Sequence, residues 1–137
     1  KALVHFEQRL TLGKELYEAY PSNVSFKNGL AISYEKLGLT EAYLGNFGKA
    51  LAYYKDEIKL FKELCEAYPQ NISFLNGLAI SNIKLGAVYE DQQDETTANN
   101  FYKIAKDILS KLVVSFPAYV EFKKNLDWAN GKLMFIK

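Results

Sequence analysis

The sequence has few of the residues that most often supply catalysis, metal binding and covalent cross-links. It contains one histidine and one cysteine among 137 residues, so an internal disulfide is excluded. No cluster with metal-ligand spacing and no glycine-rich phosphate loop is present. We therefore expect no enzyme, no metal and no cofactor. The single Cys65 is compatible with a reducing compartment, and we expect a cytoplasmic protein.

The chain also lacks long apolar runs and blocks of like charge. No stretch of 18 apolar residues occurs, which argues against a membrane span. The 17 basic and 16 acidic residues are interspersed and give a net charge of +1, so no basic footprint for nucleic acid is visible. Hydrophobic residues make up 49% of the chain and aromatic residues 15%, enough for a substantial core.

The main feature of the sequence is an internal repeat. The stretch Lys14–Gly38 returns as Lys62–Gly86, 48 residues further on, and the two copies differ at six of 25 positions. A divergent third copy follows at the same distance, Ser110–Met134, and keeps Leu112, Pro117, Phe122, Leu126, Lys132 and Leu133. A fixed period of this length is typical of stacked repeat arrays.

Apolar residues recur every three or four positions over long segments, the pattern of amphipathic helices. Prolines 21, 69 and 117 interrupt it, since proline disfavours the helical conformation of the preceding residue. We expect helices over residues 1–20, 24–44, 48–68, 72–91, 96–116 and 119–135. Asn23, Asn71, Asn46 and Asp94 are expected to cap the helices that follow them. The glycines at 29, 38, 77 and 86 lie inside helices, which predicts close approach of a neighbouring backbone or ring.

The repeat resembles the tetratricopeptide repeat, whose pattern is W-x₂-L-G-x₂-Y…A-x₃-F…P. The second copy has Leu85-Gly86-x₂-Tyr89, then Ala98-x₃-Tyr102, then Pro117; the first has Leu37-Gly38, Ala50-x₃-Tyr54 and Pro69. Asn82 stands at the usual tryptophan and Glu41 at the usual tyrosine. The family period is about 34 residues, so each helix here is longer by about two turns.

The resemblance implies an all-α fold of antiparallel helix hairpins stacked as a right-handed α-solenoid, counted as five helices. Residues 1–137 would form one repeat domain, a fragment of a longer array. Its parts would be residues 1–21 (second helix of a partial repeat), 22–69 and 70–117 (full repeats), and 118–137 (last helix). Similar long repeats occur in large bacterial multidomain proteins.

Several residues admit a functional and a structural interpretation. His5 corresponds to Tyr53 and Phe101, and Cys65 to Tyr17 and Val113, 48 residues apart in each case; both are interpreted as packing or surface residues. Asn23 and Asn71 begin N-x-S sequons, but repetition of a helix cap explains them equally. The abundant aromatic rings favour core packing over single-strand binding.

In the tetratricopeptide family the first helix of each repeat lines a concave groove. The resemblance therefore implies a partner-binding face with eight candidate residues: Asn28, Glu35, Leu39, Tyr43, Asn76, Ile83, Ala87 and Glu90. Ile32, Ile80 and Trp128 lie on the same stripe and could equally pack between helices.

We expect a non-catalytic scaffold that binds a peptide or protein segment in this groove. Two alternatives remain open. One is a sensor or regulatory module of a larger signalling protein. The other is a structural spacer that self-associates through uncapped repeat ends.

Overall fold

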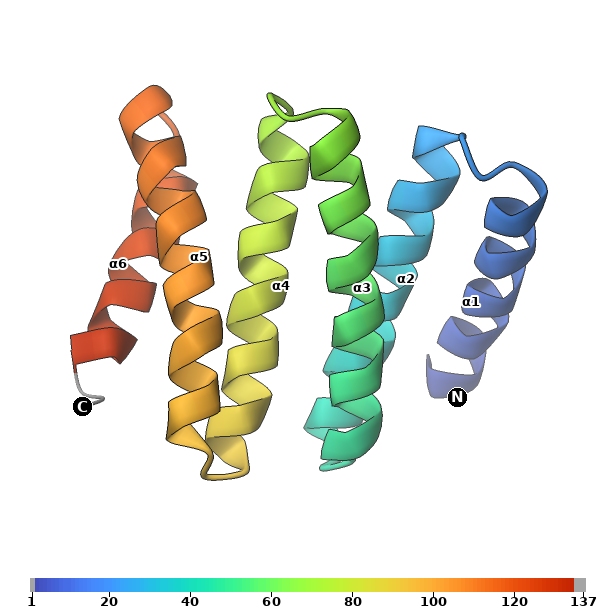
Figure 1. Ribbon diagram of the computed structural model, residues 1–137. Coiled ribbons are helices and arrows are strands. Elements are labelled where there is room, and N and C mark those ends of the chain that lie inside the picture. Colours follow the sequence, from blue (N-terminus) through green and yellow to red (C-terminus); the bar gives the residue numbers. More distant parts are fainter. Residues whose placement is uncertain (1, 135–137) are drawn as a thin grey trace. The chain divides into compact units, whose positions relative to one another are not determined.

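The computed structural model describes residues 2–134, and these residues form six α-helices and no strand (Figure 1). The helices are α1 (Ala2–Ala19), α2 (Val24–Tyr43), α3 (Phe47–Ala67), α4 (Ile72–Asp91), α5 (Glu95–Ser115) and α6 (Val120–Met134). The all-α expectation is confirmed and the helix boundaries agree within one or two residues. The expected count of five helices was wrong, since the described residues form six. The expected segments 1–21, 22–69, 70–117 and 118–137 contain one, two, two and one of them. The expected end of the last helix, Phe135, lies outside the described residues.

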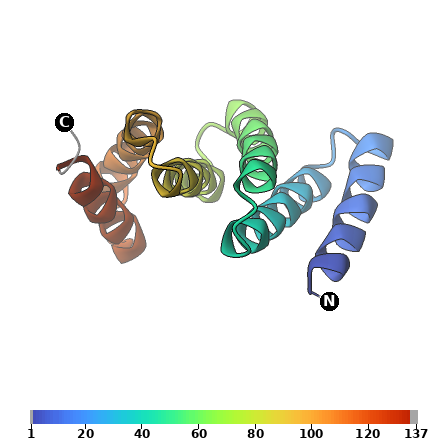
Figure 2. The same ribbon diagram turned by 90° about the horizontal axis from the view of Figure 1, so that it is seen from below.

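The chain divides into two compact units, Lys1–Pro69 and Gln70–Lys137. The division falls at the expected boundary between residues 22–69 and 70–117. In the first unit α2 packs against both α1 and α3; in the second, α5 packs against both α4 and α6 (Figure 2). Each unit is therefore three antiparallel helices, with the middle one covered on two sides.

Asparagine and aspartate side chains cap three of the helices as expected. The Oδ1 atoms of Asn23 and Asn71 accept hydrogen bonds from the backbone amides of Phe26 and Phe74, at 2.9 and 3.0 Å. Asp94 does the same for Thr97 at 3.1 Å. A cap of this kind stabilises a helix by about 1 kcal/mol. The two sequon asparagines thus have a structural role that explains their repetition.

Asn46 does not act as a side-chain cap, and this expectation was wrong. It precedes α3, but its Nδ2 instead donates a hydrogen bond to Glu41 Oε1 at 2.8 Å. Glu41 is buried, with 1% of its surface exposed, so its carboxylate requires a donor more than the helix end does. Glu41 therefore redirects the asparagine.

Two helical glycines confirm the expected close approach of a ring. A Cβ atom on Gly38 would lie 2.5 Å from Cε1 of Tyr54, and one on Gly86 would lie 2.7 Å from Cε1 of Tyr102. Each contact joins the two helices of one hairpin, α2 to α3 and α4 to α5. Gly29 has nothing within 4 Å of its Cβ position, so close approach does not explain that glycine.

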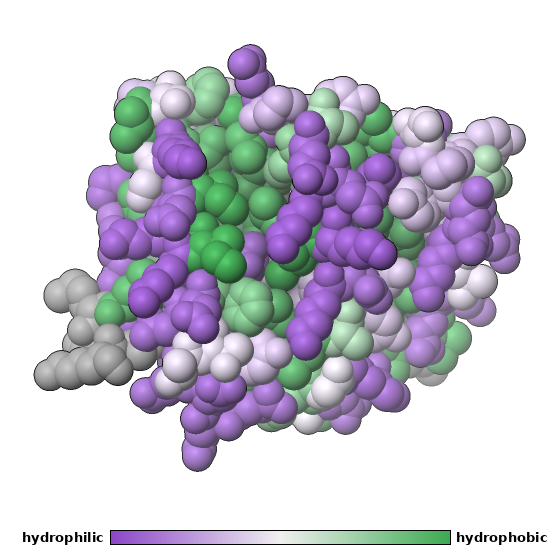
Figure 3. All heavy atoms as spheres, viewed as in Figure 1, coloured by the Kyte–Doolittle hydropathy of each residue, from purple (hydrophilic) through white to green (hydrophobic). Residues whose placement is uncertain are grey.

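The core of the second unit is built mainly from the apolar stripes of α4, α5 and α6. One cluster of buried residues there consists of Ala79, Ala105, Leu109, Leu112 and Phe122. On the outer surface, rows of hydrophilic residues follow the helices and hydrophobic residues lie between them (Figure 3). The amphipathic pattern read from the sequence therefore separates core from surface helix by helix.

Candidate functional site

The expected binding residues of the first unit lie along one face of α2. Asn28, Glu35, Leu39 and Tyr43 are separated by seven, four and four residues, so they share a helix face. Leu39 is 54% exposed and Tyr43 is 91% exposed. Ile32, on the same stripe, is 39% exposed. We call Ile32, Leu39 and Tyr43 the α2 stripe.

The α2 stripe is held on a well-supported helix. The opposite side of α2 is buried through Leu30, Tyr34 and Leu37. The Asn23 cap fixes the start of the helix, and the Tyr54 ring packed on Gly38 fixes its distance from α3. The backbone that carries these side chains is therefore ordered before a partner binds, which lowers the entropic cost of binding.

The expected binding residues of the second unit are less exposed to a partner than Leu39 and Tyr43 of the first. Asn76, Ile83, Ala87 and Glu90 all lie on α4, and all are partly buried. Ile83 packs against the core cluster of that unit. The positions that match Leu39 and Tyr43, 48 residues on, are Ala87 and Asp91. The exposed apolar stripe of α2 is thus not repeated on α4.

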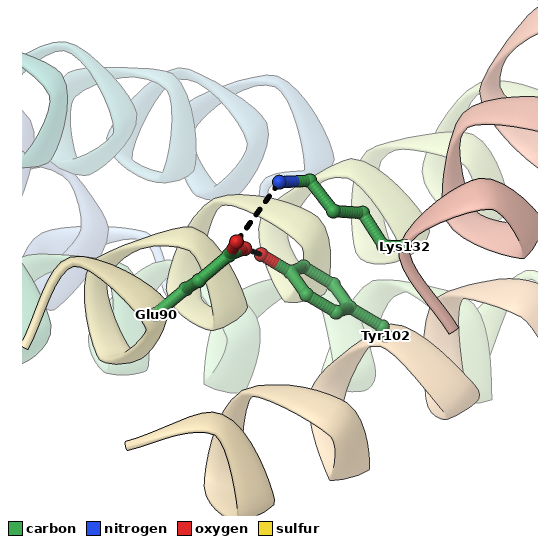
Figure 4. A network of polar contacts seen from close by, with 3 residues as sticks. All are labelled: Glu90, Tyr102 and Lys132. Carbon is green, nitrogen blue, oxygen red and sulfur yellow. Dashed lines mark hydrogen bonds and ion pairs between the residues drawn. The ribbon is translucent and has the colours of Figure 1, made fainter. Parts of the chain in front are cut away.

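Glu90 is engaged in a polar network with α5 and α6 (Figure 4). Its carboxylate accepts hydrogen bonds from the Tyr102 hydroxyl at 2.6 Å and from Lys132 Nζ at 3.0 Å. The Tyr102 ring meets Trp128 edge-on, with centroids 5.5 Å apart, and Lys132 Nζ lies 5.4 Å from the Trp128 ring centroid. The network therefore fastens α6 to the α4–α5 hairpin.

The electrostatics of this network follow from its contacts. The hydrogen bond from Tyr102, followed by the hydrogen bond and charge of Lys132, lowers the pKa of the Glu90 carboxyl, and partial burial opposes that shift. Burial, reinforced by the Glu90 carboxylate, raises the pKa of the Tyr102 hydroxyl. Glu90 is consequently charged and internally paired, which makes it a weaker candidate for binding an outside partner than Leu39 or Tyr43.

Two hollows open on the first unit, on different sides of α2. The larger, of about 340 Å³, is lined by residues of α1, α2 and α3 that include Lys14, Tyr17, Tyr34 and Glu63. Its polar groups contact one another: the Tyr17 hydroxyl lies 3.4 Å from Glu63 Oε1, and Lys14 Nζ lies 5.9 Å from the Tyr34 ring centroid. With charges of both signs already engaged, this hollow favours no particular ligand charge.

The smaller hollow, of about 150 Å³, lies between α1 and α2 next to the α2 stripe. It is lined by Phe6, Arg9, Gly29, Ile32, Ser33 and Lys36. Ile32 belongs to both features, so the hollow adjoins one end of the stripe. Phe6, Arg9, Ser33 and Lys36 were not among the residues expected from the sequence. The signal available there was the lysine that recurs at positions 36, 84 and 132.

His5 and Cys65 are the single histidine and the single cysteine of the chain, and neither lines the two hollows. His5 is exposed on α1. Cys65 is partly buried on α3, and burial raises the pKa of its thiol, whereas a reactive cysteine needs a lowered one. Among residues 2–134 no three His, Cys, Asp or Glu side chains gather as potential metal ligands. None of the helices described has the length and apolar character required to cross a membrane.

Comparison of the chain with models of known protein families gives no match. Comparison with curated proteins gives no match either.

Proposed function

We propose that the protein is a non-catalytic binding module that holds a peptide or protein segment against the exposed face of α2. The observation that carries the proposal is the α2 stripe, in which three large apolar side chains align on one helix. The exposed fractions of Ile32, Leu39 and Tyr43 are 39%, 54% and 91%. Exposed apolar groups gathered on one face are typical of interaction surfaces.

The dimensions of the stripe suit a short segment. Ile32 and Tyr43 are eleven residues apart, which is about 16 Å along a helix axis. That length matches about five residues of extended chain or three turns of a second helix. A tyrosine and a leucine are side chains that can act as anchors by burial, with polar contacts at the edge. The partner is therefore expected to present two or three apolar side chains in a row.

In finer terms, we propose that the units belong to a tetratricopeptide-like array with right-handed stacking. The support is the 48-residue repeat together with the glycine–tyrosine contact found in both hairpins. Assignment of the expected groove residues on α2 and α4 to partner binding rests on this proposal. Within it, the exposure of Leu39 and Tyr43 favours α2 as the principal contact.

Self-association is a second candidate, favoured by the exposure of apolar residues on α1. Leu12 is exposed, whereas Leu60, 48 residues on, is buried on α3. A second copy could cover this side of α1. Sedimentation measured over a hundredfold range of concentration tests this: a rising molecular mass supports association, and a constant monomer mass contradicts it.

The main proposal is tested by selecting binders from a displayed library of random 12-residue peptides and measuring their affinities. Replacing both Leu39 and Tyr43 by serine should weaken the selected peptides at least tenfold, because each truncation of a buried anchor costs about 1 kcal/mol or more. The matched control is Val114→Ser, which removes an exposed apolar side chain from α5.

The helical circular dichroism of all three proteins should be the same, since the replaced side chains are exposed. Failure of the library to yield any saturable binder would contradict the proposal. Equal affinities for the double variant and the parent protein would show that the peptides bind elsewhere.

A further inference from the structure

The smaller hollow on the first unit combines apolar and cationic lining residues. Phe6 and Ile32 supply apolar surface, and Gly29 adds no side chain. The Ser33 hydroxyl is already used, since it donates a hydrogen bond to the Gly29 carbonyl at 3.1 Å. The charged groups that line it are Arg9 from α1 and Lys36 from α2.

Both charged groups are cationic, and within residues 2–134 neither has an acidic partner. Among the described residues no ion pair involves Arg9 or Lys36. Both side chains are exposed, so they can turn toward a ligand. Two unpaired cations beside an apolar floor favour an anionic ligand that also carries apolar surface.

The second unit contains the same helix pair with its hollow filled. Positions 6, 32 and 36 correspond, 96 residues on, to Tyr102, Trp128 and Lys132. There the Trp128 indole packs edge-on against the Tyr102 ring. Lys132 Nζ lies over the indole and also binds the Glu90 carboxylate at 3.0 Å (Figure 4). The α5–α6 pair therefore shows that this site accommodates an aromatic ring, and Glu90 of α4 places a carboxylate beside that ring.

At the matching positions the first unit keeps the lysine, Lys36, but lacks the indole. Ile32 takes the place of Trp128, and a smaller side chain leaves the hollow of about 150 Å³. A volume of about 150 Å³ is enough to hold a benzene ring. In addition, Arg9 takes the place of Ala105, so the first unit has a cation that the second lacks.

We propose that this hollow binds a carboxylate attached close to an aromatic ring, with the ring on Phe6 and Ile32 and the carboxylate between Arg9 and Lys36. This inference rests on the proposed function, because the α2 stripe adjoins the hollow and one segment could occupy both. It specifies the chemistry of that segment: an acidic residue beside an aromatic one, or an aromatic residue at a chain end.

The probe for the test is N-acetyltryptophan, which joins one indole to one carboxylate. It is titrated into the full ¹⁵N-labelled chain while the backbone amide signals are followed by NMR. Saturable shifts are expected at Phe6, Gly29, Ile32 and Lys36, with a dissociation constant on the order of 1 mM. N-acetyltryptophanamide keeps the ring without the charge, and acetate keeps the charge without the ring. Both should bind at least threefold more weakly.

Three variants locate the site. Ile32→Trp installs the residue of the second unit and should abolish the shifts, because its own indole fills the hollow. The double variant Arg9→Met/Lys36→Met keeps both stems and removes both charges. It should weaken N-acetyltryptophan about twofold to thirtyfold, since each of the two exposed charge pairs contributes about 0.2–1 kcal/mol, and leave the amide unaffected. Lys62→Met, an exposed lysine of α3, is the matched control.

Equal binding of the acid and the amide would overturn the assignment of a carboxylate. Unchanged binding by Ile32→Trp, with its circular dichroism intact, would overturn the location, as would an absence of saturable shifts in the parent protein. The Arg9/Lys36 variant decides the charge claim should Ile32→Trp fail to fold. The two proposals can fail separately. If N-acetyltryptophan does not bind in the hollow but the selected peptides still require Leu39 and Tyr43, the proposed function stands.

Discussion

The replacement of Gly38 by alanine tests how the two helices of a hairpin are joined. The added Cβ would lie 2.5 Å from Cε1, 2.7 Å from Cδ1 and 3.0 Å from Cζ of Tyr54. Ordinary contacts begin at 3.4 Å, and the Tyr54 ring is buried. The methyl group can therefore be accommodated only if the ring or the helix moves.

Two effects of opposite sign determine the result. Alanine is favoured over glycine inside a helix by about 1 kcal/mol. Overpacking a well-filled core costs about 1–3 kcal/mol, and overlap with three atoms of one ring places Gly38→Ala at the upper end of that range. The net expectation is a loss of about 2 kcal/mol in the free energy of unfolding.

Gly29→Ala is the matched control on the same helix. Nothing lies within 4 Å of its Cβ position, so only the propensity effect remains and a gain of about 1 kcal/mol is expected. Urea unfolding followed by circular dichroism measures both variants. The two substitutions should differ by about 3 kcal/mol although their chemistry is identical.

A second background isolates the ring as the cause. Tyr54→Val removes the three ring atoms that lie nearest the added Cβ, at a cost of several kcal/mol for the lost packing. In that background Gly38→Ala should change sign and stabilise the protein by about 1 kcal/mol. Equal effects of Gly38→Ala with and without the ring would refute the reasoning, as would a Gly38→Ala protein as stable as Gly29→Ala.

The remaining predictions concern a turn and a titration. Gln93 has φ 66° in the α4–α5 turn, where the matching α2–α3 position is Gly45 with φ 83°; this conformation costs a side-chain-bearing residue about 1–2 kcal/mol. Gln93→Gly should therefore raise the free energy of unfolding by about 0.5–1 kcal/mol, and Gly45→Ala should lower it by about 1 kcal/mol; unfolding midpoints that move the other way would contradict this. The lowered pKa of Glu90 in the folded state means that its contacts with Tyr102 and Lys132 stabilise the protein above the ordinary carboxyl pKa of 4.5, and that this contribution is lost as the pH falls through the lowered value. Glu90→Gln should be less stable than the parent at pH 7 and approach it in acid, and a difference that does not vary between pH 7 and pH 2 would rule out the charge of Glu90 as its source.

The helices and their ends were determined by local sequence. Apolar spacing, the prolines and the asparagines that follow two of them act over a few residues, so their consequences can be read without the fold. Close approach at Gly38 and Gly86 was also expected, because a repeated glycine inside a helix has a cost. The same reasoning failed at Gly29, whose Cβ position has no neighbour within 4 Å. The 48-residue repeat placed these features twice and so made each interpretation stronger.

The expected site residues show that local sequence does not determine which side chains are exposed. Leu39 and Ile83 lie on the same stripe of equivalent helices by spacing alone. Leu39 is exposed, whereas Ile83 packs against the core of its unit. Spacing assigns a residue to a helix face, but the neighbouring helices decide whether that face meets solvent.

The sequence by itself determined that this chain forms long antiparallel helices with capped ends, since propensity and capping depend on neighbours in the chain. Only the tertiary structure decided which polar groups meet across helices. Examples are Asn46 donating to Glu41 rather than capping α3, and Glu90 held by Tyr102 and Lys132. It also decided that Ile32 leaves space where Trp128 fills it. The physical reason is that burial and pairing depend on distances between residues far apart in sequence, and packing alone sets those distances.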